Sequence, residues 1–376
     1  MSGIGAAVVG TGFIGVVHVE ALRRIGVDVV GVVGSTPERA AQKRDLPEPY
    51  ESFEAMLDDD RVRVVHLTTP NHLHYPQVKS VLAAGKHVVC EKPLALTSGE
   101  SGELLRLAED SGLVHCTNYN IRFYPLLHEA RQRVSDGELG RVWNAHGTYS
   151  QDWLLEATDW NWRLDPELGG SLRAVADIGT HWLDLTGWIA NRRVAAVFAD
   201  LYTVHPVRHV PTGPVETYAD AGEAERVDRE MTTEDVAHVL LRYDDGSRGQ
   251  VTISQVSAGR KNHISFELDG SEGALAWSSE RHEELWLGHR DRPNEILFRD
   301  PGLMRGPLRG DYPGGHAEGF TDTFKQLYRA VYAAVEEGRM PAEPNFPTFA
   351  DGHEEILLGE AIARSAATER WVEVER

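Results

Sequence analysis

A glycine-rich turn between an apolar run and a helical pattern limits most strongly what this chain can fold into. The apolar run leads into Gly10-Thr-Gly12-Phe-Ile-Gly15, and a helical pattern follows. In such a strand–turn–helix unit the first glycine permits a tight turn, the second lets the backbone approach a pyrophosphate, and the third lets the helix pack on the strand. The turn predicts a dinucleotide site that includes Phe13 and Ile14; a glycine-rich turn without a ligand is the alternative.

Short apolar runs alternate with helical patterns over the first third of the chain. Continuous Val-rich strands separated by helices are typical of a parallel sheet that is covered on both faces. Because crossovers between parallel strands are right-handed, the alternation predicts a doubly wound, Rossmann-type α/β fold. The expected strands are residues 4–9, 27–33, 62–68, 87–90 and 113–117, and the expected helices are residues 14–25, 37–44, 75–84 and 98–111.

The pattern changes after about residue 121. Period-two alternation between turn signals indicates an antiparallel sheet with one wetter face, in an α+β arrangement. Because 376 residues exceed the usual size of one core, we expect two domains, residues 1–121 and 122–376. The expected strands here are residues 142–150, 194–201, 237–243, 249–257 and 264–269, and the expected helices are residues 125–135, 177–189, 318–336 and 351–368. Residues 204–229 are expected to form a surface excursion, and residues 290–316 an irregular loop over the sheet.

Composition excludes several classes of partner. The net charge of −20 argues against nucleic acid, because phosphate binding needs clustered Lys and Arg. No apolar run has the length of a membrane span, and the first residues lack the pattern of a signal peptide. Cys90 and Cys116 lie in strand-like runs, so neither a disulfide framework nor a cysteine zinc site is expected. These features are typical of the reducing cytoplasm.

The residues that would contact the adenosine ribose depart from the usual pattern. An acidic residue is expected about 20 residues after the glycine turn, but Ser35 and Thr36 follow the second expected strand instead. Without the carboxylate a 2′-phosphate is not repelled, and Arg39 can reach it. The two hydroxyls can equally bind the plain ribose of NAD while Arg39 stacks on adenine. Both NAD and NADP are therefore kept as cofactors.

The tripeptide Glu91-Lys92-Pro93 follows directly after the expected strand 87–90. Ligands of parallel sheets bind outside the carboxyl ends of the strands, and Lys92 falls there. Pro93 restricts the backbone of Lys92 to extended conformations, which holds the ammonium in a fixed direction. Such an ammonium can hydrogen-bond a reacting hydroxyl and stabilise alkoxide character as a hydride leaves. A solvated surface lysine is the alternative.

Asp177 and His181 stand four residues apart on an expected helix, so their side chains share one face. Histidine is suited to take a hydroxyl proton near neutral pH, and Asp177 can bind a substrate hydroxyl or orient the transfer. A helix-start aspartate beside a structural histidine is the alternative. No third ligand stands at a convincing spacing, so no metal site is expected.

In their order and spacing these motifs resemble those of the glucose-fructose oxidoreductase/inositol dehydrogenase/rhizopine-catabolism (Gfo/Idh/MocA) family. The resemblance covers essentially the whole chain and includes Thr69-Pro70-Asn71-His72 and Gly169-Gly170. It implies that Lys92, Asp177 and His181 are the catalytic set. It also implies that the nicotinamide side of the site is lined by Thr69, Asn71, His74, Glu91 and Asn120, and that Pro70 and Lys92 belong to the cofactor site.

The segment Trp160-Asn-Trp162-Arg163 resembles a stretch that approaches the nicotinamide or the substrate in this family. Aromatic faces suit sugar rings and a guanidinium can bind hydroxyls, so Trp162 and Arg163 are expected at the cofactor and Arg163 also at the substrate. Core packing is the alternative for Trp160. The family's second domain is typically a large, open, mostly antiparallel sheet that builds homodimers or homotetramers. The substrate wall is expected to include Tyr149, Gln151 and His316.

Residues and resemblance together predict an NAD(P)-dependent oxidoreductase. It would move a hydride between nicotinamide and a hydroxyl carbon of a sugar, glycoside or cyclitol. His181, helped by Lys92, would remove the hydroxyl proton beside the cofactor. One alternative is a cofactor-dependent sensor with the same fold, which the retained catalytic residues disfavour. The other is a glycosidase whose bound NAD is oxidised and reduced transiently within each turnover.

Overall fold

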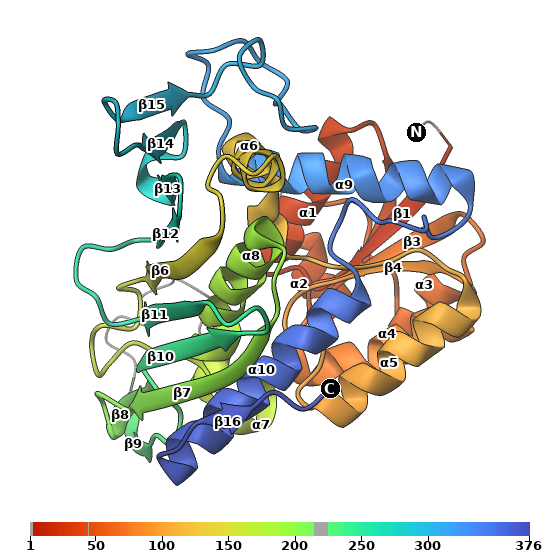
Figure 1. Cartoon of the computed structure of the whole chain (residues 1–376). Helices are drawn as coiled ribbons and strands as arrows, with labels where there is room; N and C mark the ends of the chain where they lie inside the picture. Colours follow the sequence, from red (N-terminus) through yellow and green to blue (C-terminus); the bar gives the residue numbers. More distant parts are fainter. Residues whose placement is uncertain (1–2, 44, 214–224) are drawn as a thin grey trace. The chain divides into compact units, whose positions relative to one another are not determined.

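A computed structural model describes residues 3–43, 45–213 and 225–376 of the chain (Figure 1). The chain divides into two compact units. The first comprises residues 1–120, 167–170 and 321–356, and the second comprises residues 121–166, 171–320 and 357–376. The domain boundary after residue 121 stays a prediction; the first unit also takes in a segment close to the carboxyl terminus. No helix in the described part of the chain is long and apolar enough to cross a membrane.

A parallel sheet of five strands in the order β2-β1-β3-β4-β5 forms the centre of the first unit. The predicted Rossmann fold is therefore confirmed. Helix α4 packs on β3 and β4 and against α5. A short helix that the sequence pattern missed, α3, follows α2. The elements are β1 Gly5–Val9, α1 Phe13–Arg24, β2 Asp28–Val33, α2 Pro37–Ala41, α3 Phe53–Leu57, β3 Val62–Leu67, α4 His74–Ala83, β4 His87–Cys90, α5 Ser98–Ser111 and β5 His115–Thr117.

The order of these strands places the candidate ligand site. β1 lies between β2 and β3, so the chain turns to one side after β1 and to the other side afterwards. In open α/β sheets, ligands bind beyond the carboxyl ends of the strands where the order reverses. Here those ends are joined by Thr68, whose hydroxyl donates to the carbonyls of Val9 and Gly10 at 3.0 and 2.9 Å. The glycine turn is thus fixed to the neighbouring strand at the switch point.

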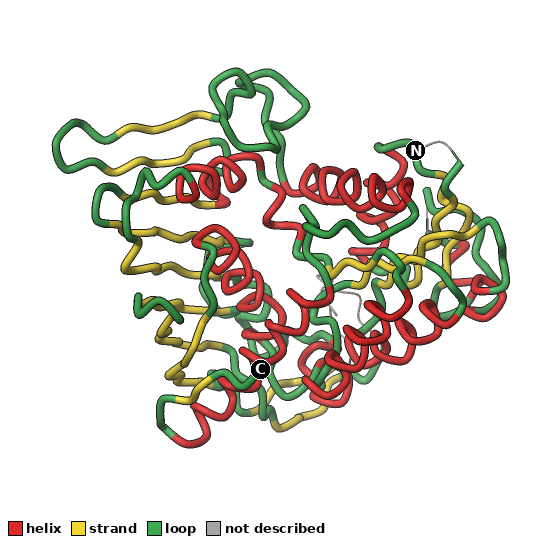
Figure 2. The backbone as a smooth tube through the Cα atoms, turned by 45° about the vertical axis from the view of Figure 1, so that its right-hand side comes forward, coloured by secondary structure: helices red, strands yellow, loops and turns green. Residues whose placement is uncertain are grey.

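A mixed sheet of nine strands forms the second unit, in the order β15-β14-β13-β12-β6-β11-β10-β7-β16 (Figure 2). Its pairs are antiparallel except β6 with β11, which are parallel. The predicted α+β domain with a large, mostly antiparallel sheet is confirmed. The strands are β6 Val142–Ser150, β7 Val194–Tyr202, β10 Val236–Tyr243, β11 Arg248–Ser254, β12 His263–Gly270, β13 Ala274–Ser278, β14 Glu284–Gly288, β15 Glu295–Phe298 and β16 Val372–Glu373.

Helices α6 and α8 pack together, and each also packs on the sheet. The contact between α8 and β6 is close at Gly147, where a Cβ would lie 2.7 Å from the indole nitrogen of Trp182. That indole is fully buried and donates to the carbonyl of Ser265 at 2.9 Å. This packing fixes α8, the helix that carries the predicted catalytic residue His181, on the sheet. The helices that complete the chain are α6 Pro125–Ser135, α7 Pro166–Gly169, α8 Thr180–Ala190, α9 Phe320–Glu337 and α10 Phe349–Thr368.

The predicted surface excursion and the predicted irregular loop both contain strands. In and just after residues 204–229, β8 (Val207–Pro211) pairs along its length with β9 (Arg226–Glu230), while residues 214–224 lie outside the described residues. The reason is Arg208, which is fully buried and donates to the carboxylate of Asp235 at 2.8 Å and to the carbonyl of Leu154 at 3.0 Å. Within residues 290–316, β15 extends the edge of the sheet.

Candidate active site

The glycine turn of the first unit has the geometry that a dinucleotide needs. Gly10 adopts φ of +104°, which favours glycine, and a Cβ on Gly15 would lie 2.0 Å from the carbonyl oxygen of Gly10. At Gly12, by contrast, a Cβ would meet no atom of the described residues within 4 Å. Because packing does not require glycine there, open space remains for a ligand beside the backbone. Phe13 is 49% exposed at the start of α1, and Ile14 is half-buried. These residues fit a pyrophosphate.

The three candidate ribose contacts lie together after β2. Ser35, Thr36 and Arg39 are exposed. The Thr36 hydroxyl caps α2 by accepting a hydrogen bond from the backbone N–H of Arg39 at 3.2 Å. This cap keeps the start of α2 beside the end of β2. The arrangement is compatible with both cofactors that the sequence leaves open.

The loop after β3 is held by side-chain hydrogen bonds. The Thr69 hydroxyl donates to Gln77 at 2.6 Å, and the Asn71 amide donates to the carbonyl of Gly169 at 3.0 Å. Pro70 precedes the short 3-10 helix Asn71–Leu73. The hydrogen bond from Asn71 to Gly169 joins two of the sequence motifs, Thr69-Pro70-Asn71-His72 and Gly169-Gly170, within one compact unit.

His74 and Asn120 are buried in the first unit and engaged there. The imidazole of His74 lies between two backbone carbonyls, with Nδ1 2.7 Å from Pro93 and Nε2 2.9 Å from Thr69. Burial lowers the pKa of this ring below its usual value. The Asn120 amide donates to the hydroxyl of Thr323 at 2.8 Å. Whether either residue contacts nicotinamide stays a prediction.

Three N–H groups converge on the carboxylate of Glu91 at the end of β4. Its Oε1 lies 3.1 Å from Nε2 of His18 and accepts from the Asn118 amide at 2.5 Å. Its Oε2 accepts from the backbone N–H of Lys92 at 3.2 Å. Glu91 is buried, Lys92 is half-buried, and the peptide bond between Lys92 and Pro93 is cis. The neighbouring carboxylate thereby binds the backbone of the predicted catalytic lysine.

Asp177 in the second unit accepts hydrogen bonds on both of its oxygens. Arg163 Nε donates to Oδ1 at 3.1 Å, and the Gln255 amide donates to Oδ2 at 2.7 Å. The structure thus brings together two predicted site residues, Arg163 and Asp177. Gln255 was not predicted. It stands just after β11, where no local pattern distinguishes it from other buried residues at a strand end.

The predicted helix over residues 177–189 starts within a π-helical turn and continues as an α-helix. Residues Val175–Gly179 form π-helix, and α8 begins at Thr180. His181 is buried in the first turn of α8, and its ring centroid lies 6.2 Å from that of Tyr149. π-turns are frequent at functional sites, where they redirect side chains. The wider turn leaves Asp177 and His181 one turn apart.

A buried charged cluster, which the sequence did not predict, supports the segment before Asp177. The Glu234 carboxylate accepts from the backbone N–H groups of Arg173 and Val175, at 3.0 and 2.8 Å. The Arg173 guanidinium pairs with Asp235 and donates to Gln255 at 2.7 Å. Burial raises the pKa of Glu234 despite these donors. The charges lie some sixty residues apart in the chain, so only the folded sheet brings them together.

Two of the expected substrate residues bind a shared partner. Tyr149 Oη and the Gln151 amide each donate to Oδ1 of Asn262 at 2.8 Å. Gln151 also accepts from Trp153 Nε1 at 2.8 Å and from Gln255 at 3.3 Å. Through Gln255 the predicted residues Gln151 and Asp177 belong to one hydrogen-bonded group.

The tryptophan segment and His316 have different surroundings. The guanidinium of Arg163 stacks 4.4 Å from the ring centroid of Trp162. Trp160 packs with a small apolar cluster and lies beneath Arg229, in line with the packing alternative. His316 is exposed in its loop, and its carbonyl accepts from the buried Arg299 at 2.6 Å. The part of His316 in the site stays a prediction.

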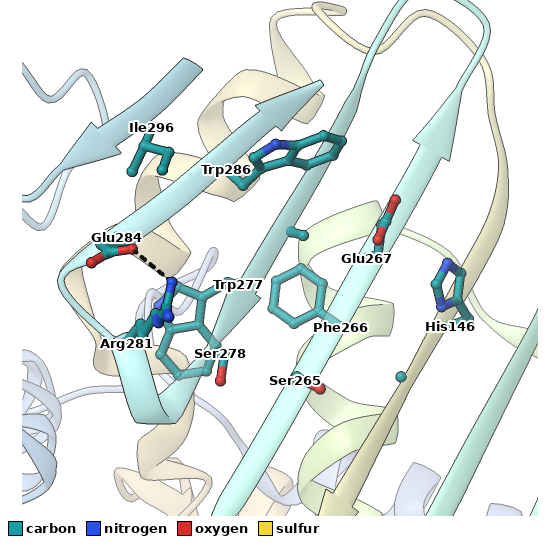
Figure 3. A pocket seen from close by; sticks show the side chains of 12 residues that line it. His146, Ser265, Phe266, Glu267, Trp277, Ser278, Arg281, Glu284, Trp286 and Ile296 are labelled. Carbon is teal, nitrogen blue, oxygen red and sulfur yellow. Dashed lines mark ion pairs between the residues drawn. The ribbon is translucent and has the colours of Figure 1, made fainter. Parts of the chain in front are cut away.

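A hollow of about 350 Å³ lies on the other face of the nine-stranded sheet (Figure 3). Trp286, Glu284 and Arg281 line one end and His146 lines the other. Beside it, His146, Glu267 and Asp269 bring one possible ligand atom each within 4.8 Å of one another. Burial, together with repulsion by Asp269, raises the pKa of Glu267. None of the predicted catalytic residues lines this hollow.

Comparison with known proteins places the chain. Residues 4–119 match the model of the oxidoreductase family with an NAD-binding Rossmann fold, and residues 127–276 match the Gfo/Idh/MocA C-terminal domain. Levoglucosan dehydrogenase of Pseudarthrobacter phenanthrenivorans is 30% identical over 342 residues, covering 89% of this chain and 86% of the relative. The chain belongs to the Gfo/Idh/MocA oxidoreductase family. It is thus an NAD(P)-dependent enzyme that acts on CH–OH groups, as its sequence predicts.

Other members of the Gfo/Idh/MocA family are similar over much of their length. D-Xylose 1-dehydrogenase (NADP(+)) 2 of Haloferax volcanii is 32% identical, covering 70% of this chain and 80% of the relative. The solved structure of levoglucosan dehydrogenase in complex with NADH and L-sorbose has a TM-score of 0.89 at 28% identity and covers 100% of both chains. The family of this chain therefore includes one sugar dehydrogenase that is named for NADP and another that is solved in complex with NADH.

Proposed function

We propose that this enzyme transfers a hydride between nicotinamide and a secondary hydroxyl or ketone of a sugar, glycoside or cyclitol. The observation that carries the proposal is the group formed by Arg163, Asp177 and Gln255, with His181 one turn along the helix. A carboxylate, a guanidinium, an amide and an imidazole can bind several hydroxyls at once, which a polyol requires. The names of its relatives, levoglucosan dehydrogenase and D-xylose dehydrogenase, support a carbohydrate substrate.

The acid–base step is assigned to His181. Its imidazole takes the proton of the reacting hydroxyl during oxidation and returns it to the carbonyl oxygen during reduction. Asp177 binds a neighbouring hydroxyl, because an ionised carboxylate can accept several hydrogen bonds at once, and Arg163 and Gln255 orient it. The ammonium of Lys92 hydrogen-bonds the reacting oxygen and stabilises its negative charge.

The cofactor is assigned to the carboxyl edge of the first sheet. The glycine turn and Ser35, Thr36 and Arg39 bind its adenosine and pyrophosphate part, and the segments at 69–74 and 91–92 bind its nicotinamide part. When bound, the nicotinamide ring accepts or donates the hydride. Trp162 and Arg163 are assigned to the cofactor, and Arg163 is assigned to the substrate as well.

A screen of monosaccharides, anhydrosugars, glycosides and inositols with NAD and with NADP tests the proposal. We expect reduced nicotinamide to accumulate with at least one polyol. Lys92→Ala should lower turnover roughly 10²–10⁴-fold while cofactor binding, followed by fluorescence, survives. The control is Lys79→Ala, which removes a half-exposed lysine paired with Glu103. Unchanged turnover in Lys92→Ala would remove this lysine from the mechanism. Cleavage of a glycoside without net reduction would favour the glycosidase.

A homodimer or homotetramer is proposed through the open face of the nine-stranded sheet. Trp143, Leu240 and Ile296 are 52%, 45% and 50% exposed within the chain. The hollow of Figure 3 lies on the same face. Large exposed apolar groups on one face favour association. Light scattering of Leu240→Asp should give a lower mass than the wild type; a monomeric wild type would contradict this part of the proposal.

A further inference from the structure

The first unit contains a buried row of polar groups that leads away from Glu91. His18 on α1 contacts Glu91 through Nε2, and its Nδ1 lies 3.1 Å from Nδ1 of His66 on β3. His66 Nε2 lies 3.1 Å from the hydroxyl of Tyr332 on α9. His18, His66 and Tyr332 are all fully buried. Burying so many polar groups is costly unless each finds a partner, so the row calls for a physical explanation.

Donor and acceptor counting gives this row one direction. The carboxylate of Glu91 can only accept, so His18 carries its proton on Nε2. In a neutral His18, Nδ1 then accepts from Nδ1–H of His66. His66 Nε2 must in turn accept from the Tyr332 hydroxyl. Burial lowers the pKa of His66 and raises that of Tyr332, which keeps the ring neutral and the hydroxyl protonated.

The reverse order leaves a donor without an acceptor. If His18 carried both protons, it would donate to His66, and His66 would donate to the oxygen of Tyr332. The hydroxyl hydrogen of Tyr332 would then need another acceptor, and His66 is its partner among the described residues. A buried donor without an acceptor costs free energy, so the first order is favoured.

We propose that His18, His66 and Tyr332 form a directional hydrogen-bond chain that positions Glu91 and, through it, the backbone of Lys92. The inference rests on the proposed catalytic role of Lys92. Glu91 receives N–H donors from His18, Asn118 and the backbone of Lys92 at the same carboxylate. This hydrogen-bond chain fixes the rotamer of Glu91 through His18, and the fixed carboxylate holds the backbone N–H of Lys92. His18, His66 and Tyr332 are thus positioning residues that touch neither substrate nor cofactor.

Helix α9 offers a matched pair of tyrosines for the test. Tyr328 and Tyr332 stand one turn apart, both are fully buried, and both rings contact His66, with centroids at 4.8 and 6.0 Å. The hydroxyl of Tyr328, however, has no hydrogen-bond partner among the described residues, whereas that of Tyr332 bonds His66. Removing each hydroxyl therefore separates the effect of the chain from the effect of altering a buried tyrosine.

We expect Tyr332→Phe to lower kcat roughly 10-fold, because a small displacement of a catalytic group slows the reaction steeply. Tyr328→Phe should stay within about twofold of the wild type. The dissociation constant of the reduced cofactor should be unchanged in both, so that the loss falls on kcat and not on binding. Equal kcat values in the two variants would overturn the inference, as would a loss that only follows the melting temperature.

Two substitutions of His18 test the contact with Glu91. His18→Met removes the donor at similar size, and we expect kcat to fall roughly 100-fold. His18→Gln keeps an amide N–H for Glu91 and should recover part of that loss. No recovery by glutamine, at equal melting temperature, would contradict positioning by hydrogen bonding.

A spectroscopic measurement tests the chain without relying on turnover. Isotope-labelled histidine, observed by NMR in the intact enzyme, should show a neutral ring with the proton on Nε2 for His18 and on Nδ1 for His66. A doubly protonated His18 would overturn the proposed direction. If the wild type oxidises no polyol, the proposed function fails, while this readout still decides the hydrogen-bond order. If Lys92→Ala is inactive but Tyr332→Phe and Tyr328→Phe have equal kcat values, the hydrogen-bond chain is refuted while the proposed function stands.

Discussion

The side-chain amide of Gln255 donates a 2.7 Å hydrogen bond to the carboxylate of Asp177. The same side chain accepts from the buried guanidinium of Arg173 at 2.7 Å. Gln255 therefore transmits the position of a rigid, buried ion pair to a predicted catalytic carboxylate. Arg163 binds the other oxygen of Asp177, so both oxygens have a defined orientation before substrate arrives. Preorganised groups of this kind save the cost of ordering them during the reaction.

Gln255→Leu should lower both activity and stability. The change leaves a donor of buried Arg173 without its acceptor, which costs about 1–3 kcal/mol of unfolding free energy. It also frees Asp177, so we expect kcat/KM to fall roughly 10- to 100-fold. Denaturant unfolding and steady-state kinetics measure the two effects. Gln250→Leu, at an exposed position of the preceding strand β11, is the control. Wild-type kinetics in Gln255→Leu would show that Asp177 needs no such support.

Two alanine substitutions in the glycine turn should affect different properties, one the cofactor affinity and the other the stability. Gly12→Ala adds a methyl group to open space, so the melting temperature should stay near that of the wild type while cofactor affinity falls roughly 10- to 100-fold. Gly15→Ala places a Cβ 2.0 Å from the carbonyl oxygen of Gly10, so it should lower stability by more than 1 kcal/mol, roughly. Calorimetry and fluorescence titration separate these outcomes. Unchanged cofactor affinity in Gly12→Ala would move the pyrophosphate elsewhere.

The pH–rate profile should report His181. A general base must be deprotonated to act, so turnover in the oxidation direction rises with pH until the imidazole is neutral. His181→Ala should lower kcat roughly 10²–10⁴-fold and flatten this rise. His238→Ala removes an exposed histidine of the same unit and should keep the profile. An inflection that persists in His181→Ala would assign the base to another group.

Stability should fall in acid partly because of His128. Burial, with Arg131 and Arg122, lowers the pKa of this ring from 6.5 to about 3. Between these values the unfolded chain binds a proton that the folded protein does not, so stability is full above pH 6.5 and is lost as pH falls. At roughly pH 5 the loss is about 2 kcal/mol. Denaturant unfolding above pH 6.5 and at roughly pH 5 measures this loss of stability, which should be smaller in His128→Gln than in the wild type. An equal loss would contradict the shift.

The fold could be predicted because its signals are local. Continuous apolar runs and helical periodicity placed β4 and α5 at their observed bounds, and a capping box with left-handed Gly112 explains the ends of α5. The strand β8 was not predicted because a buried arginine, and not an apolar pattern, fixes it. From sequence alone, Arg208 would be expected at the surface. Edge strand β15 escaped because it is short and surrounded by Pro and Gly.

The candidate site was predicted as a set of motifs and not as a network. The contact between Arg163 and Asp177 could have been predicted, since the two residues have opposite charges and each lies in a recognised motif. Gln255 and His18 were not, because their partners stand many residues away and neutral side chains give no pattern. Such contacts depend on strand order and helix placement, which local sequence does not determine.

The transfer of a hydride from a carbinol carbon to the cofactor is the central claim. A polyol substrate found in the screen can be labelled with deuterium at the carbon that is oxidised, and the nicotinamide isolated after turnover can be weighed by mass spectrometry. We predict one deuterium in each reduced nicotinamide, together with one molecule of ketone. Deuterium that stays in the product, with no net reduced cofactor, would contradict a dehydrogenase.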